Sequence, residues 1–582
     1  MISLFNQIRK ILFVFDKNFL SFLPLIILFL FASFLELLSL GLIVPYIKFL
    51  IQPEPSLSFG SFNFSILFNE NITRQEFFIY FSLIFILIFF IKTFFIVLVR
   101  ALISRFSLKN LKNLQVNLMT VYQNMSYKNF IEKNHSEYIR NIRELGAACM
   151  TCLEMGLRIL SEIMVVIAIF IFLLFLQPIP LLIITSVIFL SYFFYSFYLK
   201  PKAVEYGKKK VEATKLIYQS VDESFKGFKE IKILGKLNFF KEFLRRGVDL
   251  VFKNDFKSSI IISSPRYFLE LVIVIFIVLF LSTQIFFGAN ENDILPIVGV
   301  FAIAGLRIMP STSIILNSIL MIGYSQESLN IIYDDLKKLK IDHSYKDKNF
   351  SEISSFQNIE FKNVNFSYPN SKNFVLTDIN LKINKDECIG LIGDTGSGKT
   401  TFVDIILGFL SPSEGKILVN EKEIKLKSSD WSNQISYLPQ DHLIINDTLE
   451  KNITLSFDKN INKVKLTNAI NQSDLTKLIQ ELSDGVKTKI GEGGVRLSGG
   501  QYKKICLARL FYHEKQILIL DEATNSLDKV SEEKVINNIN VFKGKKTIIL
   551  ISHNHNTLKN CDRIFKVSNR NISDFTSEFQ KI

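Results

Sequence analysis

Cysteine is scarce in this sequence, and the few cysteines form no pattern. The 582 residues include five of them, an odd number divided between two distant regions. A small secreted scaffold held by paired disulfides is therefore excluded, and we expect no disulfide. Cys149 and Cys152 have the spacing of half a zinc site, but no second pair of Cys or His residues lies near enough in the sequence to complete one. We interpret them as two small thiols one helical turn apart.

Acidic residues are also fewer than basic ones. The chain has 54 Asp and Glu against 68 Lys and Arg, which gives a net charge of +14. Such an excess can indicate a nucleic-acid partner, but membrane proteins also concentrate basic residues in their cytoplasmic loops. Hydrophobic residues make up 49 % of the chain and Phe alone occurs 56 times, which excludes an ordinary soluble enzyme. We therefore predict a membrane protein surrounded by lipid, with no nucleic-acid partner.

Long apolar runs occur only in the first part of the chain. A helix needs about 20 consecutive apolar residues to cross a bilayer, and six segments are long enough. They are 19–50, 77–98, 159–176, 179–199, 267–287 and 294–322. The first is too long for a cleavable signal peptide, and no small-residue cleavage site follows it. Before it, residues 8–15 place apolar side chains on one helical face beside Arg9 and Lys10, which predicts a short helix in the cytoplasmic interface.

Basic residues are nearly absent from three of the loops between these runs. The loop 51–76 contains only Arg74, and the loops after the third and fifth runs contain none. The stretches 100–158 and 200–257 are by contrast dense in Lys and Arg. The positive-inside rule therefore predicts a multi-pass protein with both termini in the cytoplasm.

The two basic stretches are too long and too periodic to be simple linkers. Their helical spacing predicts that the membrane helices continue into the cytoplasm. Such extensions would meet the next domain at short turns. We place one turn near Tyr127–Phe130 and the other near 220–227.

The pattern changes completely from about Phe350, because no later run is long enough to span a membrane. Short β-rich stretches at 387–392, 516–520 and Thr547–Ile551 alternate there with helical segments, which indicates an α/β domain. We therefore divide the chain into a transmembrane domain of six helices, residues 1–340, and a nucleotide-binding domain, residues 341–582.

A glycine-rich loop follows the first of these strands. It reads Gly393-Asp394-Thr395-Gly396-Ser397-Gly398-Lys399-Thr400. This is the GxxxxGK[ST] pattern between a strand and a helix, the context that a phosphate-binding loop requires and a plain glycine-rich turn does not. Glycines let the backbone wrap phosphates, and the helix N-terminus directs free N–H groups at them. Lys399 should reach the terminal phosphates, and the Thr400 hydroxyl should bind Mg²⁺.

A second candidate element is the apolar strand that ends in Asp521 and Glu522. A carboxylate at the tip of a buried strand beside a phosphate-binding loop can hold Mg²⁺, which we assign to Asp521. Glu522 is then placed to polarise the attacking water as a general base. An acidic pair that merely faces solvent is the alternative.

The string Leu497-Ser498-Gly499-Gly500-Gln501 lies between these two elements. An LSGGQ string between Walker A and Walker B motifs resembles the ATP-binding cassette (ABC) ATPases. The two Walker motifs alone would admit many ATPases, but this third string excludes most of them. The resemblance implies an ATP hydrolase with ATP and Mg²⁺ as cofactors.

Several other positions match the pattern of that family. Tyr368 resembles the aromatic residue that stacks on adenine, Gln440 the Q-loop residue that senses Mg²⁺, and His553 the switch histidine that contacts the γ-phosphate. His555 competes for the last role but lies two residues farther from its strand. The resemblance therefore implies Glu522, His553 and Gln440 as catalytic residues.

The remaining family positions complete the expected site. Ser526-Leu527-Asp528 resembles the D-loop, and Gly491-Glu492-Gly493 resembles the segment that contacts the cytoplasmic turns of the membrane domain. The expected metal ligands are Thr400, Gln440 and Asp521. The expected ATP-binding residues are Tyr368, Gly393, Asp394, Thr395, Gly396, Ser397, Gly398, Lys399, Thr400, Thr401, Ser498, Gly499, Gly500 and Gln501.

In that family the signature residues of one subunit close over ATP bound to the phosphate loop of another. This chain has one phosphate loop and one LSGGQ string, so two copies of the domain must come together. A homodimer is the simplest assembly and would contain two identical sites. A different chain with its own cassette is the alternative.

Six predicted spans ahead of one cassette resemble the ABC exporter half-transporters, with a type I/type IV exporter fold. Ionisable residues within spans are default functional candidates, and Lys92, Arg266 and Arg307 are basic. An Arg side chain suits phosphate because its planar fork donates two parallel hydrogen bonds. Lys92 and Arg266 have a simpler explanation, which is that they extend to the cytoplasmic interface.

Local sequence around these residues narrows the resemblance. The stretches 265–270, 306–311, 127–130 and 134–139 look like those of the bacterial PglK-type flippases of lipid-linked oligosaccharides. The resemblance implies a polyprenyl-pyrophosphate glycan as substrate, flipped across the cytoplasmic (inner) membrane for protein glycosylation. Alternating apolar residues at 57–68 resemble that family's external lipid-binding segment, although an ordinary surface loop fits nearly as well.

Two other functions stay open. The first is an exporter of peptide, lipid A or hydrophobic drug, which a broad apolar cavity without basic residues would favour. The second is an ATP-gated channel or a regulatory receptor, which would tolerate loss of Glu522.

Overall fold

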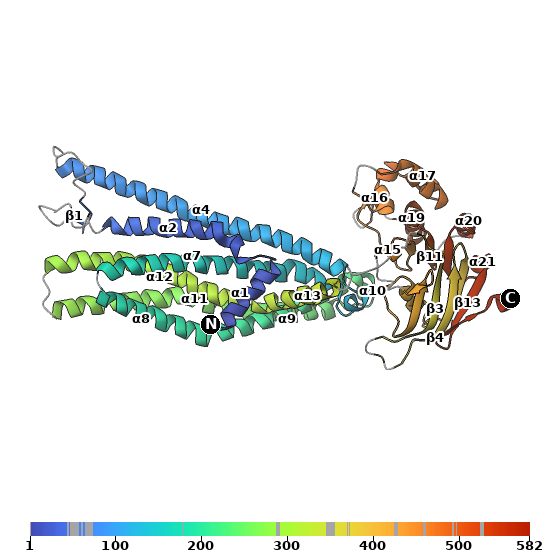
Figure 1. Ribbon diagram of the computed structural model, residues 1–582, viewed down its shortest axis with the longest axis horizontal. Helices are drawn as coiled ribbons and strands as arrows, with labels where there is room; N and C mark the ends of the chain where they lie inside the picture. Colours follow the sequence, from blue (N-terminus) through green and yellow to red (C-terminus); the bar gives the residue numbers. More distant parts are fainter. Residues whose placement is uncertain are drawn as a thin grey trace. The chain divides into compact units, whose positions relative to one another are not determined.

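The computed structural model describes residues 2–43, 46, 58–59, 62–63, 74–176, 178–286, 291–344, 355–368, 371, 373–423, 429–457, 461–491, 494–495, 497–523 and 529–581 (Figure 1). The chain separates into two compact units. The helical unit comprises Met1–Met125 and Asn129–Asp342, and the α/β unit comprises Ser126–Lys128 and His343–Ile582.

The helical unit is built from long helices. Its elements are α1 (Ile2–Val14), η1 (Phe19–Phe22), α2 (Leu23–Gly41), β1 (Ser58–Phe59), β2 (Phe62–Asn63), α4 (Arg74–Gln123), α6 (His135–Arg140), η3 (Asn141–Leu145), α7 (Gly146–Leu176), α8 (Pro178–Phe194), η4 (Tyr195–Leu199), α9 (Lys200–Lys226), α10 (Phe228–Ile233), α11 (Leu237–Phe286), α12 (Glu291–Tyr324) and α13 (Gln326–Ser344). Helix α2 packs on α4 and α7, and α12 packs on α7, α9 and α11 (Figure 1).

Three described helical stretches are long and apolar enough to cross a membrane: Phe19–Gly41, Phe78–Gln123 and His135–Phe175. A fourth would be the pair Arg307–Tyr324 and Gln326–Lys338, which bends by 51°. The predicted spans 179–199 and 267–287 coincide largely with α8, η4 and α11, and parts of these elements lie outside the residues whose side chains are described. The count of six spans therefore stays a prediction.

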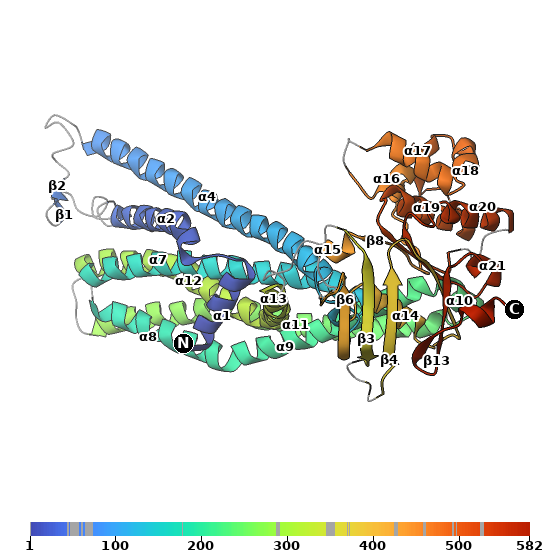
Figure 2. The same cartoon turned by 45° about the vertical axis from the view of Figure 1, so that its right-hand side comes forward.

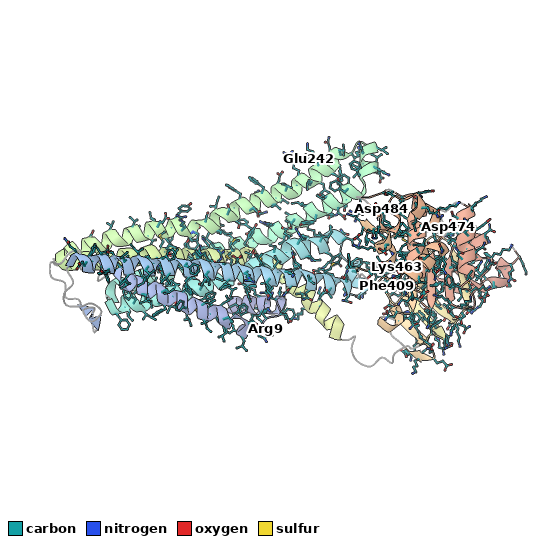
Figure 3. All side chains as sticks on the ribbon, turned by 90° about the horizontal axis from the view of Figure 1, so that it is seen from above. Arg9, Glu242, Phe409, Lys463, Asp474 and Asp484 are labelled. Atoms are coloured by element: carbon teal, nitrogen blue, oxygen red, sulfur yellow. The ribbon has the colours of Figure 1, made fainter. Side chains whose placement is uncertain are left out.

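Helix α1 is the predicted short N-terminal helix, and its polar side chains bind α13. Gln7 Nε2 donates to Gln326 Oε1 at 2.7 Å, and Lys10 Nζ donates to Asn330 Oδ1 at 2.6 Å. The face that carries Ile11 is buried, whereas Arg9 points outward (Figure 3). Helix α1 is thus fastened to the last helix of this unit.

Both predicted cytoplasmic turns coincide with features of the helical path. A short helix, α5, occupies Tyr127–Phe130, and the Tyr127 ring stacks on Phe409 within the α/β unit with centroids 5.3 Å apart. The second turn is predicted near 220–227, and the break between α9 and α10 falls within this range, at Gly227.

The α/β unit contains two main sheets. Its elements are β3 (Asn358–Phe366), β4 (Leu376–Asn384), β5 (Cys388–Gly393), α14 (Lys399–Ile406), β6 (Glu414–Val419), β7 (Lys422–Glu423), α15 (Ser429–Ser432), β8 (Ile435–Leu438), β9 (Asp447–Thr448), α16 (Leu449–Thr454), α17 (Lys463–Gln472), α18 (Thr476–Glu481), η5 (Gly485–Lys487), β10 (Lys489–Ile490), α19 (Gly499–Tyr512), β11 (Ile517–Asp521), α20 (Lys529–Asn540), β12 (Thr547–Ile551), α21 (His555–Leu558), β13 (Arg563–Ser568), β14 (Asn571–Asp574) and α22 (Thr576–Phe579).

The larger sheet has the order β14-β13-β5-β12-β11-β8, and all its pairs are parallel except β13–β14. The smaller sheet is antiparallel with the order β4-β3-β6-β7 (Figure 2). Strands β5, β11 and β12 are apolar and almost wholly buried. Because these strands are parallel, their C-terminal ends lie at the same edge of the larger sheet. In open parallel sheets, ligands bind outside that edge.

One hydrophobic core lies between the two sheets. It includes α14 and Trp431, the single tryptophan of the chain, whose ring is fully buried. Trp431 Nε1 donates to the carbonyl oxygen of Ile406 at 2.7 Å. This hydrogen bond fixes the C-terminal end of α14, the helix that follows the glycine-rich loop.

Candidate functional site

The glycine-rich loop joins β5 to α14, and its backbone needs glycine. Gly398 precedes α14 with a φ of 109°, in the left-handed region that favours glycine. A Cβ at Gly393 would lie 2.5 Å from the carbonyl oxygen of Val567 and 2.8 Å from Ser397 Oγ. Larger residues would therefore push apart the loop and β13.

The loop also leaves polar groups ready for an anion. Ser397 Oγ is buried and has no hydrogen-bond partner among the described residues. Lys399 Nζ donates to the carbonyl oxygens of Gly393 at 2.6 Å and Asp394 at 2.9 Å. Burial lowers the pKa of Lys399, whereas the nearby charges of Glu522, Asp394 and Asp521 raise it. An anionic phosphate would offset this burial, so the residues present fit a nucleotide phosphate.

The two carboxylates at the end of β11 face this loop. Asp521 is the last residue of the buried strand, and burial raises its pKa, with the charge of Glu522 adding to the effect. Glu522 follows with a φ of 51°, which is uncommon for a residue with a side chain. Its backbone N–H donates to the carbonyl oxygen of Ile551 at 2.9 Å, so the neighbouring strand β12 holds the turn. Backbone strain of this kind is concentrated at functional sites.

Two side chains from other strands converge on Glu522. Gln440, just after β8, donates from Nε2 to Glu522 Oε2 at 3.1 Å. His553, just after β12, places Nε2 at 3.7 Å from Glu522 Oε1. The three predicted catalytic residues therefore lie together, at the ends of strands β8, β11 and β12. His555 is turned elsewhere, because its ring stacks on Phe579 with centroids 4.8 Å apart.

Tyr368 lies beside the start of α14. Its hydroxyl is 3.2 Å from Thr401 Oγ1, and its ring packs edge-on against Phe366 at 5.1 Å. This contact places Tyr368 beside the phosphate-loop helix, and its predicted stacking on adenine stays a prediction. Thr400 follows Lys399 in the first turn of α14 and is exposed.

The signature string lies at the N-terminus of α19. Ser498 caps this helix: Gln501 N donates to Ser498 Oγ at 3.3 Å, and Ser498 N donates to Gln501 Oε1 at 2.8 Å. Among the described residues, no hydrogen bond, ion pair or ring contact joins Leu497–Gln501 to the glycine-rich loop of the same chain. The predicted D-loop, residues 526–528, lies outside the described residues, as do Glu492 and Gly493.

Sequence reasoning missed one residue of this site. Lys503, on α19, donates from Nζ to the backbone oxygen of Glu522, and its side chain is almost wholly buried. The LSGGQ string predicts where α19 begins, but the sequence does not distinguish the adjacent Lys503 and Lys504 that follow it. Only the folded helix shows which of them points at β11.

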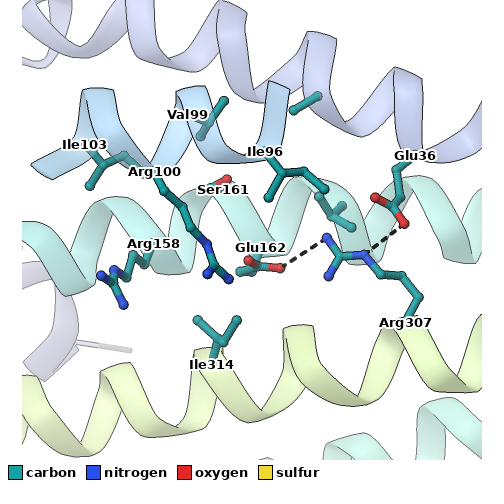
Figure 4. Close-up of a pocket in the computed structure, with 12 residues that line it drawn as sticks. Glu36, Ile96, Val99, Arg100, Ile103, Arg158, Ser161, Glu162, Arg307 and Ile314 are labelled. Atoms are coloured by element: carbon teal, nitrogen blue, oxygen red, sulfur yellow. Dashed lines mark ion pairs between the residues drawn. The ribbon is translucent and has the colours of Figure 1, made fainter. Parts of the chain in front are cut away.

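A second group of charges lies within the helical unit. Glu36 on α2 is only 1 % exposed, and its Oε1 lies 2.8 Å from Lys92 Nζ on α4. The same oxygen lies 2.9 Å from Arg307 Nε on α12 (Figure 4). Arg307 Nη2 is also 3.9 Å from Glu162 Oε2 on α7. Two of the three predicted basic residues therefore meet at one buried carboxylate.

A small cavity adjoins this charge cluster, which we define as Glu36, Lys92, Glu162 and Arg307. The cavity has a volume of about 40 Å³ and is also lined by Arg100, Arg158 and Ser161 (Figure 4). Such a volume holds only a few water molecules. Any larger ligand would require the four helices to move apart.

Arg266 does not join the charge cluster. It lies on α11 with its side chain 68 % exposed and pairs with Glu270 at 3.1 Å. The predicted external segment at 57–68 lies almost entirely outside the described residues. Sequence reasoning did not name Glu36 and Glu162 as candidate residues, although both lie inside predicted spans. The rule that ionisable residues within spans are functional candidates applies to acidic residues as well as basic ones.

Comparisons with known proteins agree with the geometry of the α/β unit. A family model described as ABC transporter matches residues 376–525. A protein of Rickettsia bellii named as an export ATP-binding/permease protein is 38 % identical over 220 residues, 37 % of this chain and 38 % of that protein. The alpha-hemolysin translocation ATP-binding protein HlyB of Escherichia coli O157:H7 is 38 % identical over 220 residues, 37 % of this chain and 31 % of HlyB.

The fold of the whole chain also has a solved counterpart. The structure of a bacterial Atm1-family ABC exporter with ATP bound matches with a TM-score of 0.76 and 16 % identity, over 96 % of this chain and 95 % of that one. The sequence matches, by contrast, span less than half of each relative. Residues 376–525 of the α/β unit therefore match the ABC transporter family, and the chain has the fold of an ABC exporter.

Proposed function

We propose that this chain is one half of an ATP-driven exporter in the bacterial cytoplasmic membrane, with both termini in the cytoplasm. Two copies would assemble into a homodimer that flips a polyprenyl-pyrophosphate-linked oligosaccharide for protein glycosylation. The observation that supports ATP-driven transport is the convergence of Gln440 and His553 on Glu522, beside the phosphate loop.

Glu522 acts as the general base in this proposal. Its carboxylate accepts a hydrogen bond from the Gln440 amide, which would orient it toward the attacking water molecule. His553 lies on the same side and would contact the γ-phosphate. Lys399 would release its hydrogen bonds to the loop carbonyls and donate to the terminal phosphates instead. The Ser397 hydroxyl, which has no partner among the described residues, would also donate to these phosphates.

The residues that would hold Mg²⁺ are Thr400, Gln440 and Asp521. The ion supplies positive charge that neutralises the phosphate oxygens. The raised pKa of Asp521 fits this role, because a cation would favour its charged form.

The assembly rests on the position of the signature helix. Ser498 and its neighbours make no described contact with the phosphate loop of their own chain, which supports a site completed by a second copy. We test this with mixtures of two inactive chains, Lys399→Ala and Ser498→Arg. If the sites are composite, a mixed dimer has one intact site out of two and regains about half of the activity of a wild-type dimer. If each chain forms its own site, the mixture stays inactive.

The substrate class rests on the charge cluster. Lys92 and Arg307 come from different helices to one point in the helical unit, where isolated charges are expensive and tend to be functional. A pyrophosphate group is a chemically suitable partner for such a pair of cations. Because the cavity beside them is small, the substrate would bind only after the helices separate, as alternating access requires.

Reconstituted proteoliposomes test the substrate. Arg307→Ala should reduce flipping of a polyprenyl-pyrophosphate glycan much more than basal ATP hydrolysis, whereas Arg266→Ala, outside the cluster, should reduce it less. Export of a polypeptide is the alternative that HlyB and its relatives favour by name. Transport of an unfolded polypeptide, lipid A or a drug, with no glycan flipping, would refute the proposed substrate and leave the ATP-driven exporter intact. Ion conduction without ATP turnover would refute both.

A further inference from the structure

Two of the five cysteines meet inside the ATPase domain. Cys388 is the first residue of β5, and Cys561 lies between α21 and β13. Their Sγ atoms are 3.6 Å apart, although the residues are separated by 173 positions in the sequence. The structure contains these cysteines as free thiols. Neither residue has a part in the proposed ATP chemistry.

The backbone holds the two cysteines together. Cys388 N donates to Asp562 Oδ2 at 2.9 Å, and Asp562 N donates to the carbonyl oxygen of Cys388 at 2.7 Å. The parallel pairing of β5 with β13 begins at the next residue, Ile389 opposite Arg563. The proximity of the sulfurs is therefore set by sheet register and not by the rotamer of one side chain.

The neighbouring residues leave room for the sulfurs. Gly390 lies two positions along β5 on the same face, and a Cβ there would be 3.5 Å from Cys561 Sγ. The Cys561 side chain thus packs directly against the backbone of β5 at this position. Disulfide sulfurs lie about 2.05 Å apart, so the pair needs to approach by roughly 1.5 Å.

The environment favours reaction between them. The pKa of Cys388 is lowered, because the Cys561 thiol can donate a hydrogen bond to the Cys388 thiolate, whereas burial opposes this. The same hydrogen bond, together with burial, raises the pKa of Cys561, so the proton they share stays on Cys561 until Cys388 takes it up. Lys543, which forms an ion pair with Asp562 at 2.7 Å, adds positive charge nearby. Cys561 is partly exposed and Cys388 is 2 % exposed, so a small reagent meets Cys561 first.

We propose that Cys388 and Cys561 form a reversible oxidation site, which closes to a disulfide when low-molecular-weight disulfides such as glutathione disulfide accumulate. The proposal is independent of the substrate and of the assembly proposed above. The disulfide would link the N-terminal end of β5, the strand before the glycine-rich loop, to the segment that precedes β13.

The chemistry balances as two thiol–disulfide exchanges. The Cys388 thiolate first accepts the proton of the partly exposed Cys561 thiol. The Cys561 thiolate formed in this way attacks glutathione disulfide, forms a mixed disulfide and releases one glutathione thiolate. The Cys388 thiolate then attacks the Cys561 sulfur and releases the second glutathione. Two protein thiols are oxidised and one glutathione disulfide is reduced to two glutathione molecules, with the two protons taken up by the released thiolates.

The expected consequence is resistance to unfolding. A bond between positions this far apart restricts the unfolded chain strongly and should raise the unfolding temperature of the ATPase domain by several degrees. The fluorescence of Trp431, which lies in the core of this domain, reports its unfolding within the full-length protein.

The test incubates the full-length protein in detergent with buffers of glutathione and glutathione disulfide, then denatures and alkylates it. We expect the number of alkylated thiols to fall from five to three, with a Cys388–Cys561 peptide found by mass spectrometry. Dithiothreitol should restore five and reverse the rise in unfolding temperature.

Matched variants separate this site from the other cysteines. Cys506→Ser, a buried cysteine in the same domain, should keep both the linked peptide and the temperature shift. Cys388→Ser and Cys561→Ser should each lose both. Stable glutathionylation of Cys561 in the wild-type protein, five alkylated thiols throughout the buffer series, or a linked peptide that contains another cysteine would each overturn the proposal.

Discussion

Two parts of this chain surround a glutamate with polar side chains, partly burying Glu522 and wholly burying Glu36, and they treat its charge in opposite ways. In the ATPase domain, Glu522 is contacted by the amide of Gln440 and the ring of His553. In the helical unit, Glu36 lies directly between the cations Lys92 and Arg307. The first arrangement orients a carboxylate with groups that can be neutral, and the second neutralises a carboxylate with full charges.

The difference reflects the surroundings of each residue. A carboxylate that must accept a proton from water cannot also be held tightly by a cation, because the ion pair would lower its basicity. A charge among membrane helices has no water to stabilise it, so a close counter-ion offsets much of the cost of burial. The surroundings of Glu522 thus suit the base of the proposed function, whereas Glu36 joins α4 and α12 to α2 through its ion pairs.

The largest effect should come from Glu522→Gln, which removes the base and keeps the side-chain shape. Turnover of ATP should fall by about 10³-fold, while ATP binding is retained. We would measure phosphate release and nucleotide affinity of the full-length protein. Glu514→Gln, which alters a half-exposed ion pair with Lys465 in the same domain, should leave both unchanged. Wild-type turnover by Glu522→Gln would contradict the assignment.

The next effect is on stability, from Glu36→Gln. The change leaves Lys92 and Arg307 without their shared counter-ion, which should cost about 3–5 kcal/mol and lower the unfolding temperature in detergent. Glu270→Gln breaks the exposed pair with Arg266 and should cost about 0–1 kcal/mol. Equal losses of stability in the two variants would contradict the expectation that the buried ion pair contributes more than the exposed one.

The smallest effect depends on pH and concerns Asp404 on α14. Burial, with a contribution from the charge of Asp521, raises the pKa of Asp404 from its ordinary value of 3.8 to about 6. The folded state therefore holds this proton more tightly than the unfolded state, and the free energy of unfolding falls as pH rises from about 4 to 6. Asp404→Asn lacks this penalty and should be more stable above pH 6 by about 1–3 kcal/mol.

Trp431 fluorescence during thermal unfolding, without nucleotide or Mg²⁺, measures this difference. The advantage of Asp404→Asn should vanish near pH 4, where both proteins carry a neutral side chain. A constant difference across this range would mean that the substitution acts through packing and not through charge.

Much of the ATP site could be predicted from the sequence because its elements are local. The strand, the glycine loop and the first turn of α14 are contiguous, so a short string fixes their geometry. The strand prediction Thr547–Ile551 matches β12, and the predicted starts of β5 and β11 lie one residue early. The pairing of Gln440 and His553 with Glu522 needed the family resemblance, since these residues come from three separate strands.

The charge cluster was only half predicted for a related reason. Lys92 and Arg307 stand out individually as basic residues within predicted spans. Nothing in the neighbouring sequence shows that they meet at Glu36, which lies 56 positions before Lys92 and 271 before Arg307. The neighbour of a membrane residue depends on which helices pack together. That packing, like the contact between Cys388 and Cys561, is absent from any short stretch of sequence.

The glycine that follows Ser498 carries one more consequence. A Cβ at Gly499 would meet no described atom within 4 Å, and the residue does not need a positive φ. Glycine weakens a helix relative to alanine, so α19 gives up stability at this position without any benefit inside its own chain. The absence of a side chain there leaves room for close approach from outside, which is what the proposed second copy would need at this point of the surface.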